Sequence, residues 1–509
     1  MLWSIIRQLA GAGATATAGD DALSAGIACV KRGEFSVARE HLQRALAQSQ
    51  EDGDAMYFLA LAEARSGNLE RAEELLHAAR AQRDDADVNS ALGNIFRLRG
   101  NLDEAAASYQ RALAVDSRHL ASLANLRLTL RDQGAPQQAL LILDRALELE
   151  PNHVEALFNK ALALTDTGAS ASAYELIERV LALDPEFAQA HLQRGFMLLK
   201  RREFAAGWRE YAWRVRIPEI DHWQDCPYPL WQGETLDGKS VLVQAEQGLG
   251  DQIMFASCLP DLLRRARRTI VECDPRLAGL FARSFPAATV YRLRAKGKPE
   301  WSREPAADFK VRCGDLPRML RNDDADFPRH SGYLVSDAAR VAGWRARLAK
   351  LGAGLKVGLS WRGGTPGTGQ AARSLALDTL LPILRVPQAN FISLQYGNVN
   401  DEIADLAAGH GIELSVWPQT MADMDDMAAL IANLDLVITV CTTAAHLCGA
   451  LGKTAWIMVP AVAEWRYLES GSQIPWYPAL RLFRQPRIDE WNEVILAIRA
   501  ELQVRAAAH

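Results

Sequence analysis

A carboxylate stands at the end of a glycine-rich turn in the stretch QAEQGLGDQIMF, residues 244–255. An apolar run precedes this turn, and an amphipathic stretch that predicts a helix over 251–266 follows it. A strand, a Gly-x-Gly turn and a helix start can hold a nucleotide phosphate on backbone N–H groups. Asp251, however, is negative where a phosphate favours positive charge. The stretch therefore predicts either a phosphate loop or a tight turn whose glycines present Asp251 at a cleft.

A second stretch with chemical potential is LDLVITVCTTAAHLCGALGKTAWIMVP, residues 434–460. An apolar strand is predicted to end at Cys441, and a helix that carries His446 is predicted to begin at Thr442 and Thr443. Two hydroxyls and the free N–H groups of a helix start suit a pyrophosphate. His446 lies about one helical turn beyond Thr443, so its ring could face the same mouth. The alternative is a capped helix with a packed histidine.

Charged and polar side chains beyond these two stretches complete the candidate site. Arg373, in GTGQAARSLAL (367–377), could bind phosphate oxygens through bidentate hydrogen bonds from its guanidinium. The alternative is an ordinary loop arginine. Gln395 ends an apolar run, and Arg466 follows a proline at the end of another. No Asp-x-Asp or carboxylate cluster follows a predicted strand in the second half of the chain, so we expect no catalytic metal and no cofactor.

The elements that must position these residues fall into two parts, of which the first is repetitive. Glycine recurs at spacings of 34, 33, 34 and 34 residues, at positions 33, 67, 100, 134 and 168, and alanine follows five residues after each. A sixth, degenerate unit has Arg202 in the glycine place. This pattern resembles the tetratricopeptide repeat over about residues 20–217, which implies a superhelix of helix pairs. Its groove is expected to dock a protein partner, with a purely structural spacer as the alternative.

From residue 218 onward, short apolar runs alternate with amphipathic stretches, which predicts βαβ units with parallel sheets. Two such sets are expected, at about 235–335 and 355–485, with an arginine-rich helix between them. The predicted organisation is an N-terminal segment, 1–20; a solenoid of five repeats and one degenerate repeat, 21–217; and two Rossmann-like halves, 218–350 and 351–509. Ligands are expected at the carboxyl ends of the strands.

Composition excludes several classes of protein. The 509 residues carry a net charge of -5 without a basic patch, which argues against a nucleic-acid binder. The seven cysteines form no C-x-x-C pair, so we expect a reducing, cytoplasmic setting. No continuous apolar run reaches the ~18 residues of a membrane span, and the N-terminus does not have the pattern of a signal peptide.

The motifs EQGLGDQIMF, VGLSWRG, ISLQYG, VITVCTTAAHLCGALGK, EWRYL and PWYPALRLFRQ together look like the glycosyltransferase domain of bacterial tetratricopeptide proteins. That domain is similar to the heptosyltransferases, which have the two-Rossmann GT-B fold. The resemblance covers about residues 230–500 and implies an acceptor-binding first half, a nucleotide-sugar-binding second half, and Asp251 as the general base of an inverting transfer. The acceptor-side loop would contain Glu246, Gln247, Gly248 and Gly250, and the donor side Trp361, Arg373, Gln395, Cys441, Thr442, Thr443, His446 and Arg466.

One position departs from the family pattern: Cys441 stands where the family usually has an aspartate that contacts the donor sugar. A thiol does not accept hydrogen bonds from sugar hydroxyls as a carboxylate does, which favours either an acidic donor sugar or an impaired site. The pairing of the two domains resembles that of bacterial flagellin glycosyltransferases. This resemblance, together with Cys441, leads to the hypothesis of an O-glycosyltransferase acting on Ser or Thr of a docked protein, specifically flagellin with a nonulosonic acid from a CMP donor. The alternatives are a non-catalytic scaffold and an enzyme acting on a lipid-linked saccharide.

Overall fold

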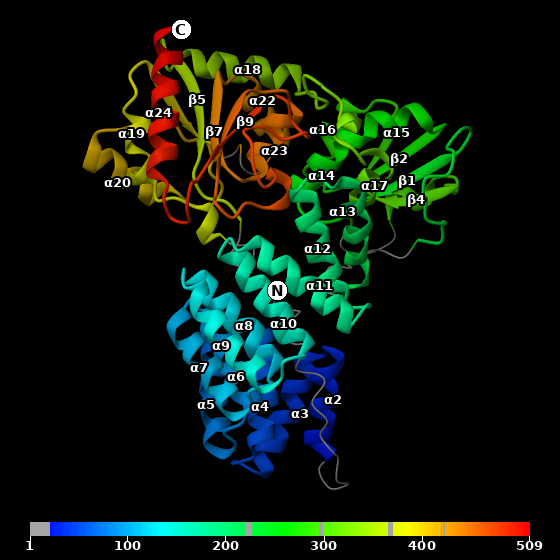
Figure 1. Ribbon diagram of the computed structural model, residues 1–509, viewed down its shortest axis with the longest axis vertical. Helices are drawn as coiled ribbons and strands as arrows, with labels where there is room; N and C mark the ends of the chain where they lie inside the picture. Colours follow the sequence, from blue (N-terminus) through cyan, green and yellow to red (C-terminus); the bar gives the residue numbers. More distant parts are fainter. Residues whose placement is uncertain (1–20, 219–225, 295–298, 365–369, 419, 421–422) are drawn as a thin grey trace. The chain divides into compact units, whose positions relative to one another are not determined.

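The computed structural model describes residues 21–218, 226–294, 299–364, 370–418, 420 and 423–509. The chain divides into two compact units, residues 1–187 and 188–509, which we describe separately (Figure 1). The predicted N-terminal segment, 1–20, lies outside the described residues, as do residues 219–225 at the start of the predicted first Rossmann-like half. No helix in the described ranges is long and apolar enough to cross a membrane.

The first unit consists of helix pairs, as the repeat pattern predicted. Between residues 21 and 187 the helices are α2 (Asp21–Arg32), α3 (Phe35–Gln48), α4 (Gly53–Arg65), α5 (Leu69–Gln82), α6 (Ala86–Leu98), α7 (Leu102–Val115), α8 (Leu120–Asp132), α9 (Pro136–Leu149), α10 (Val154–Asp166) and α11 (Ser170–Leu183). Each repeating glycine lies between the two helices of a pair. These five pairs form the predicted solenoid.

The repeated residues have the two roles that the pattern requires. The five glycines all have left-handed backbones, with φ between 74° and 88°, a conformation that costs other residues free energy. The five following alanines are at most 2% exposed, which fits small residues packed between the paired helices. Glycine thus reverses the chain and alanine sets the spacing between helices.

The second unit begins with one more helix pair, α12 (Ala188–Lys200) and α13 (Phe204–Tyr211). Arg202 joins these helices with φ 66°, the same left-handed conformation as the repeating glycines. The degenerate repeat therefore keeps the turn of the others without the glycine. Trp208 of α13 is fully buried and donates its indole N–H to the carbonyl of Arg321 at 2.8 Å, which ties this pair to the α/β elements that follow.

The first sheet of the second unit is entirely parallel, in the order β3-β2-β1-β4. Its strands are β1 (Ser240–Gln244), β2 (Arg268–Cys273), β3 (Ala288–Arg292) and β4 (Phe309–Arg312), and its helices are α14 (Leu249–Phe255), α15 (Leu259–Arg265), α16 (Ala278–Ser284) and α17 (Leu316–Leu320). The single helix predicted over 251–266 is instead divided, because a 3-10 turn (Ala256–Cys258) separates α14 from α15, which begins at Leu259 with Pro260 in its first turn.

The second sheet is also parallel, in the order β6-β5-β7-β8-β9. Its strands are β5 (Leu355–Ser360), β6 (Ala389–Ser393), β7 (Leu436–Val440), β8 (Ala455–Val459) and β9 (Leu480–Arg484). The accompanying helices are α18 (Ala338–Ala349), α19 (Leu381–Leu384), α20 (Asn400–His410), α22 (Met424–Ala432), α23 (Thr443–Ala450) and α24 (Asn492–Ala507). The prediction of two parallel-sheet halves is confirmed, although strands β4 and β9 were not foreseen.

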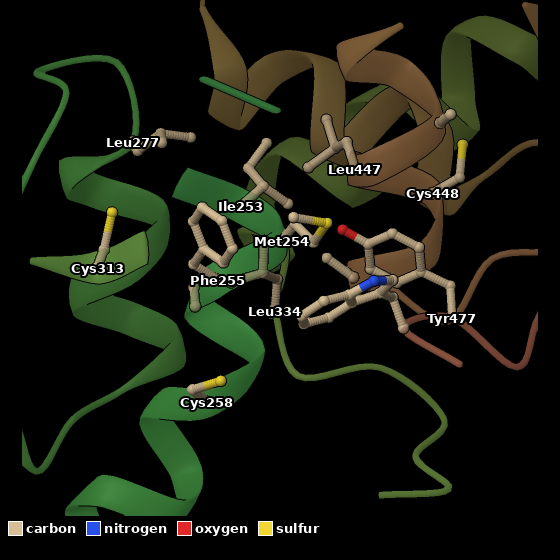
Figure 2. Close-up of a cluster of buried hydrophobic side chains, with 14 of the residues drawn as sticks. Ile253, Met254, Phe255, Cys258, Leu277, Cys313, Leu334, Leu447, Cys448 and Tyr477 are labelled. Atoms are coloured by element: carbon tan, nitrogen blue, oxygen red, sulfur yellow. The ribbon is translucent and has the colours of Figure 1, made fainter. Parts of the chain in front are cut away.

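One hydrophobic core joins the two halves of this unit. Ile253, Met254 and Phe255 of α14 pack in the same buried cluster as Leu447 and Cys448 of α23 (Figure 2). A separate core lies within the second half and includes the strand residues of β5 and β7 together with α24. The shared cluster fixes α14, which carries Asp251, against α23, which follows Thr442.

The segment that connects the halves is held closely against the second one. The backbone N–H groups of Tyr333 and Leu334 donate to the carbonyl of Ala450, at 2.7 and 2.9 Å. Gly452 has a left-handed φ of 69°, and a Cβ there would lie 1.6 Å from the carbonyl oxygen of Ser331. The GALGK sequence at the end of α23 therefore provides the room in which the connecting segment lies.

Candidate functional site

The strand order places the two predicted motifs at the points where binding sites form in such sheets. In parallel α/β sheets, ligands bind beyond the carboxyl ends of strands where the strand order reverses. In the first sheet that point lies between β1 and β4, and the loop after β1 is the one that carries Asp251. In the second it lies between β5 and β7, and Cys441 and Thr442 follow β7 directly.

The turn before α14 is tight for a reason that the sequence did not predict. Gln247, with φ 61°, is the left-handed residue of the turn, whereas neither Gly248 nor Gly250 has a positive φ. The side-chain amide of Gln247 donates to the hydroxyl of Tyr211. The expectation that the glycines make the turn is therefore wrong, since an ordinary residue held by a hydrogen bond makes it.

Gly250 instead allows α14 to approach α23. A Cβ at this position would lie 2.9 Å from Cδ2 of His446, closer than real side chains come. His446 is buried, and its Nδ1 lies 3.0 Å from the hydroxyl of Tyr477. Burial and the nearby Arg466 lower the pKa of His446 to about 4, against the opposite effect of Asp251. The ring is therefore neutral at neutral pH and packs beside the Asp251 turn.

Asp251 forms an ion pair with Arg466 across 215 positions of sequence. Nε of Arg466 donates to Oδ1 of Asp251 at 2.8 Å, and Nη2 donates to the same oxygen. Nη1 donates to Glu464 at 3.2 Å, and the guanidinium lies 4.7 Å from the centre of the Trp465 ring. Burial lowers the pKa of Arg466, but Asp251 and Glu464 outweigh it and raise the value.

Arg373 completes a chain of alternating charge. Its Nη1 donates to Glu464 at 2.5 Å, and the side chain is mostly buried. The order is thus Asp251, Arg466, Glu464 and Arg373, with Asp251 from the first half and the other three from the second. The sequence left open whether Arg373 is a site residue or an ordinary loop arginine. The fold brings it into the same cluster as Asp251.

Glu246 has a structural role at the base of the turn. Its carboxylate accepts from Arg214, at 2.5 and 3.2 Å, and from the backbone N–H of Gly314 at 2.8 Å. Arg214 is 1% exposed and also donates to Asp315 at 2.8 Å. Glu246, which was predicted to lie in the acceptor-side loop, therefore binds the β1 loop to the β4 loop.

The two threonines predicted to bind the donor lie directly after β7, and one of them already has a hydrogen-bond partner. Thr442 is the N-cap of α23, and its hydroxyl lies 3.1 Å from that of Thr439. Thr443 is half-buried in the first turn of the helix. Gly363, in the loop after β5, packs against this turn, because a Cβ there would lie 2.9 Å from the carbonyl oxygen of Cys441. The loops after β5 and β7 thus meet at the start of α23.

Cys441 is a buried neutral thiol. Its Sγ lies 3.8 Å from the carbonyl oxygen of Met458. Burial, with the nearby Glu464, raises the pKa of the thiol to about 12. A thiolate is therefore not formed at neutral pH, and Cys441 is an uncharged, buried group directly after β7.

Two predicted donor-side residues serve the framework. The side-chain Oε1 of Gln395 accepts from the backbone N–H groups of Trp361 and Arg362, at 2.9 and 2.8 Å, and its Nε2 donates to two carbonyls. Trp361 is fully buried in the second core, with its indole N–H on Glu402 at 2.9 Å. Both side chains fix the loop after β5, and packing accounts for their positions without a ligand.

Sequence reasoning gave little weight to Glu464 and none to Tyr211. Glu464 is the carboxylate that holds both candidate arginines, and Tyr211 holds the left-handed Gln247. The EWRYL motif could have indicated the role of Glu464, since it places this acid two residues before Arg466. Tyr211 belongs to the degenerate repeat and carries no motif that marks it. Among the residues that the structure describes, no group of histidine, cysteine, aspartate and glutamate side chains is arranged to hold a metal ion.

Comparison with known proteins decides the nature of the repeats. A tetratricopeptide-repeat model matches residues 30–95 and 130–194, and a second such model matches residues 90–121. The N-terminal region carries tetratricopeptide repeats. Similar solved structures include MamA, at 18% identity and a TM-score of 0.28 over 32% of this chain and 96% of MamA, and Pseudomonas aeruginosa PilF, at 18% identity and 0.33 over 39% and 91%. These low scores carry no weight for function.

One curated relative extends the similarity beyond the repeats. The chain is 32% identical to Protein FlbA of Caulobacter vibrioides over 332 residues, which is 62% of this chain and 55% of FlbA. The chain thus spans about half the length of this relative. The aligned region is longer than the 187 residues of the first unit, so the similarity extends into the α/β unit.

Proposed function

We propose that this protein is an inverting, metal-independent glycosyltransferase that transfers a sugar from a nucleotide donor to a hydroxyl of a protein held by the repeats. The observation that supports the proposal most strongly is the Asp251–Arg466–Glu464–Arg373 cluster. It brings a carboxylate from the first switch point together with two guanidiniums beside the second. One candidate base and two candidate phosphate-binding groups are what this reaction requires.

The chemistry assigns a role to each group. The acceptor oxygen attacks the anomeric carbon of the donor sugar as its proton passes to Asp251. The bond from that carbon to the nucleotide phosphate breaks, and the phosphate leaves with the electron pair. Arg466 and Arg373 neutralise the departing charge together with the N–H groups at the start of α23. An inverting transfer requires that the base and the leaving group lie on opposite faces of the sugar ring.

The donor proposal rests on Cys441. The neutral, buried thiol removes one carboxylate from the donor side, which favours a sugar that carries its own negative charge. A nonulosonic acid from a CMP donor has this property. Flagellin is our proposed acceptor class because of the family resemblance. Tetratricopeptide solenoids present a concave protein-binding surface, and the first unit would provide it here.

The direct test is a glycosyl-transfer assay with purified protein, candidate acceptor and CMP-, UDP- and GDP-linked donors, read by intact-mass spectrometry. We expect a mass increase with the acidic-sugar donor, and a loss of about 10²- to 10⁴-fold in rate for Asp251→Ala. Equal rates for the wild type and Asp251→Ala would refute the assignment of Asp251. Calorimetry that shows tighter binding of neutral-hexose nucleotides would refute the donor proposal.

A non-catalytic scaffold is the second candidate function. The observation that favours it is that Asp251 is already paired with Arg466 while the usual family carboxylate is replaced by Cys441. A third possibility is transfer onto a lipid-linked saccharide. A truncated protein distinguishes it from transfer onto a protein and from a non-catalytic scaffold. Because α12 and α13 belong to the second compact unit, the deletion should remove residues 1–187 and keep both helices. A protein acceptor docked by the repeats requires that transfer be lost, whereas a lipid-linked acceptor predicts that it persists.

A further inference from the structure

The charge cluster connects two functions that the reaction needs at different moments. Arg466 contributes Nε and Nη2 to one oxygen of Asp251 and Nη1 to Glu464. Both partners of the first pair are largely buried, with side chains 17% and 15% exposed. The carboxylate proposed to accept a proton is therefore bound to the guanidinium proposed to bind phosphate, and neither is free for its own task while the ion pair persists.

This arrangement is balanced in charge without a ligand. Two carboxylates and two guanidiniums alternate, and Glu464 holds both arginines, at 3.2 and 2.5 Å. A guanidinium has five N–H donors in a rigid fork that fits phosphate as well as carboxylate. A phosphate that enters the cluster thus competes with Asp251 for the same face of Arg466, and Glu464 keeps the fork in place during the exchange.

We infer that the donor phosphate releases the base: it takes Arg466 from Asp251, so that Asp251 becomes available to the acceptor only when a donor is bound. The inference rests on the proposed function and adds an order of events to it. Donor binding precedes productive acceptor binding, and the unliganded protein holds its base in an ion pair. No bond is made or broken in this step, because a carboxylate is exchanged for a phosphate on one guanidinium.

The exchange has a consequence that a simple binding site lacks. If Asp251 competes with phosphate for Arg466, then removal of the carboxylate must strengthen phosphate binding. We expect Asp251→Asn to bind inorganic pyrophosphate about tenfold more tightly than the wild type, which corresponds to a gain of about 1.4 kcal/mol in binding free energy. Arg466→Gln should weaken binding. Asp251→Ser provides a second variant with the same expected gain, in case the asparagine variant does not fold.

A matched control is available in the same unit. Asp261 also forms an ion pair with an arginine, Arg321, and its side chain is likewise 17% exposed. Asp261→Asn removes the same charge away from the cluster, so its affinity for pyrophosphate should equal that of the wild type. An equal gain in both aspartate variants would instead reveal a general charge effect and overturn the inference.

The experiment is isothermal calorimetry of the full-length chain with pyrophosphate, CMP and UDP, after tryptophan fluorescence has shown that each variant is folded. Tighter binding in the Asp251 variants alone supports the inference. Equal affinity in the wild type and these variants overturns it and leaves the proposed function standing. If none of the three anions binds to any form, the inference and the proposed function both fail.

Discussion

Gly250 lies where α14 of the first α/β half packs closely against α23 of the second, and this contact gives a test of the packing that positions Asp251. Alanine at this position would place its Cβ 2.9 Å from Cδ2 of His446. The ring has little freedom to move aside, because it is buried and its Nδ1 is engaged with the hydroxyl of Tyr477. Either α14 must shift away from α23, or the His446–Tyr477 contact must lengthen.

The expected loss can be worked from these contacts. Insertion of a methyl group into a packed core costs about 1–3 kcal/mol. Alanine is favoured over glycine within a helix by about 1 kcal/mol, and less in a first turn such as this one. The net effect should be a loss of about 1–2 kcal/mol in the free energy of unfolding of the second unit.

Urea unfolding followed by tryptophan fluorescence measures this loss. Of the 13 tryptophans, 12 lie at or beyond residue 208, so their emission reports the second unit. Gly343→Ala is the matched control, since this glycine lies within α18 and nothing approaches its Cβ position within 4 Å. Gly343→Ala should be stabilised by up to about 1 kcal/mol. A similar gain in Gly250→Ala would refute the close-approach interpretation.

Three further variants test other parts of the structure. His446 should make the second unit sensitive to acid: its folded pKa of about 4 lies below the ordinary value of about 6.5, so the stability it supports is complete above pH 6.5 and is lost as the pH falls toward 4. The difference in unfolding free energy between the wild type and His446→Gln should change by up to about 3 kcal/mol over that range in urea titrations, and a constant difference would contradict a buried neutral ring. Gly100→Ala should cost about 1–2 kcal/mol through backbone strain alone, because φ is 82° and no atom lies within 4 Å of the added methyl. Circular dichroism should detect this loss while the tryptophan transition stays unchanged; a shift in the tryptophan transition would show that the effect is not confined to the solenoid. Glu246→Gln should destabilise the second unit by about 3 kcal/mol, since it leaves the charge of buried Arg214 only partly compensated, and a neutral effect by tryptophan fluorescence would show that Asp315 suffices.

The sequence predicted the elements whose cause is local. Gly100 and its equivalents need a left-handed backbone, and Ala105 and its equivalents need space, so both recur at a fixed spacing that can be counted. The strands likewise follow from short apolar runs, except β4 and β9. In FKVR and LRLFR, charged residues interrupt the apolar pattern, and parallel pairing to a buried neighbour decides the conformation.

The sequence did not predict what depends on distant contacts. Gln247 takes a left-handed conformation because Tyr211, 36 residues earlier, holds its side chain, so the neighbouring glycines misled the interpretation of the turn. Likewise, Asp251 and Arg466 were proposed for separate tasks, and no local pattern indicates that they form an ion pair. Such pairs follow from the way the two halves pack.

The connecting segment at Tyr333 has a mechanical consequence for this unit. Its backbone N–H is bonded to Ala450 in the second half, and its hydroxyl donates to the carbonyl of Ile253 in the first at 2.7 Å. A hinge needs residues that are free to change their backbone angles, whereas this residue is fastened on both sides. Separation of the halves therefore requires that one of these hydrogen bonds of Tyr333 break. It also requires that the apolar side chains between α14 and α23 be exposed to water. Substitutions that soften this joint should speed ligand exchange at Asp251 at the expense of stability.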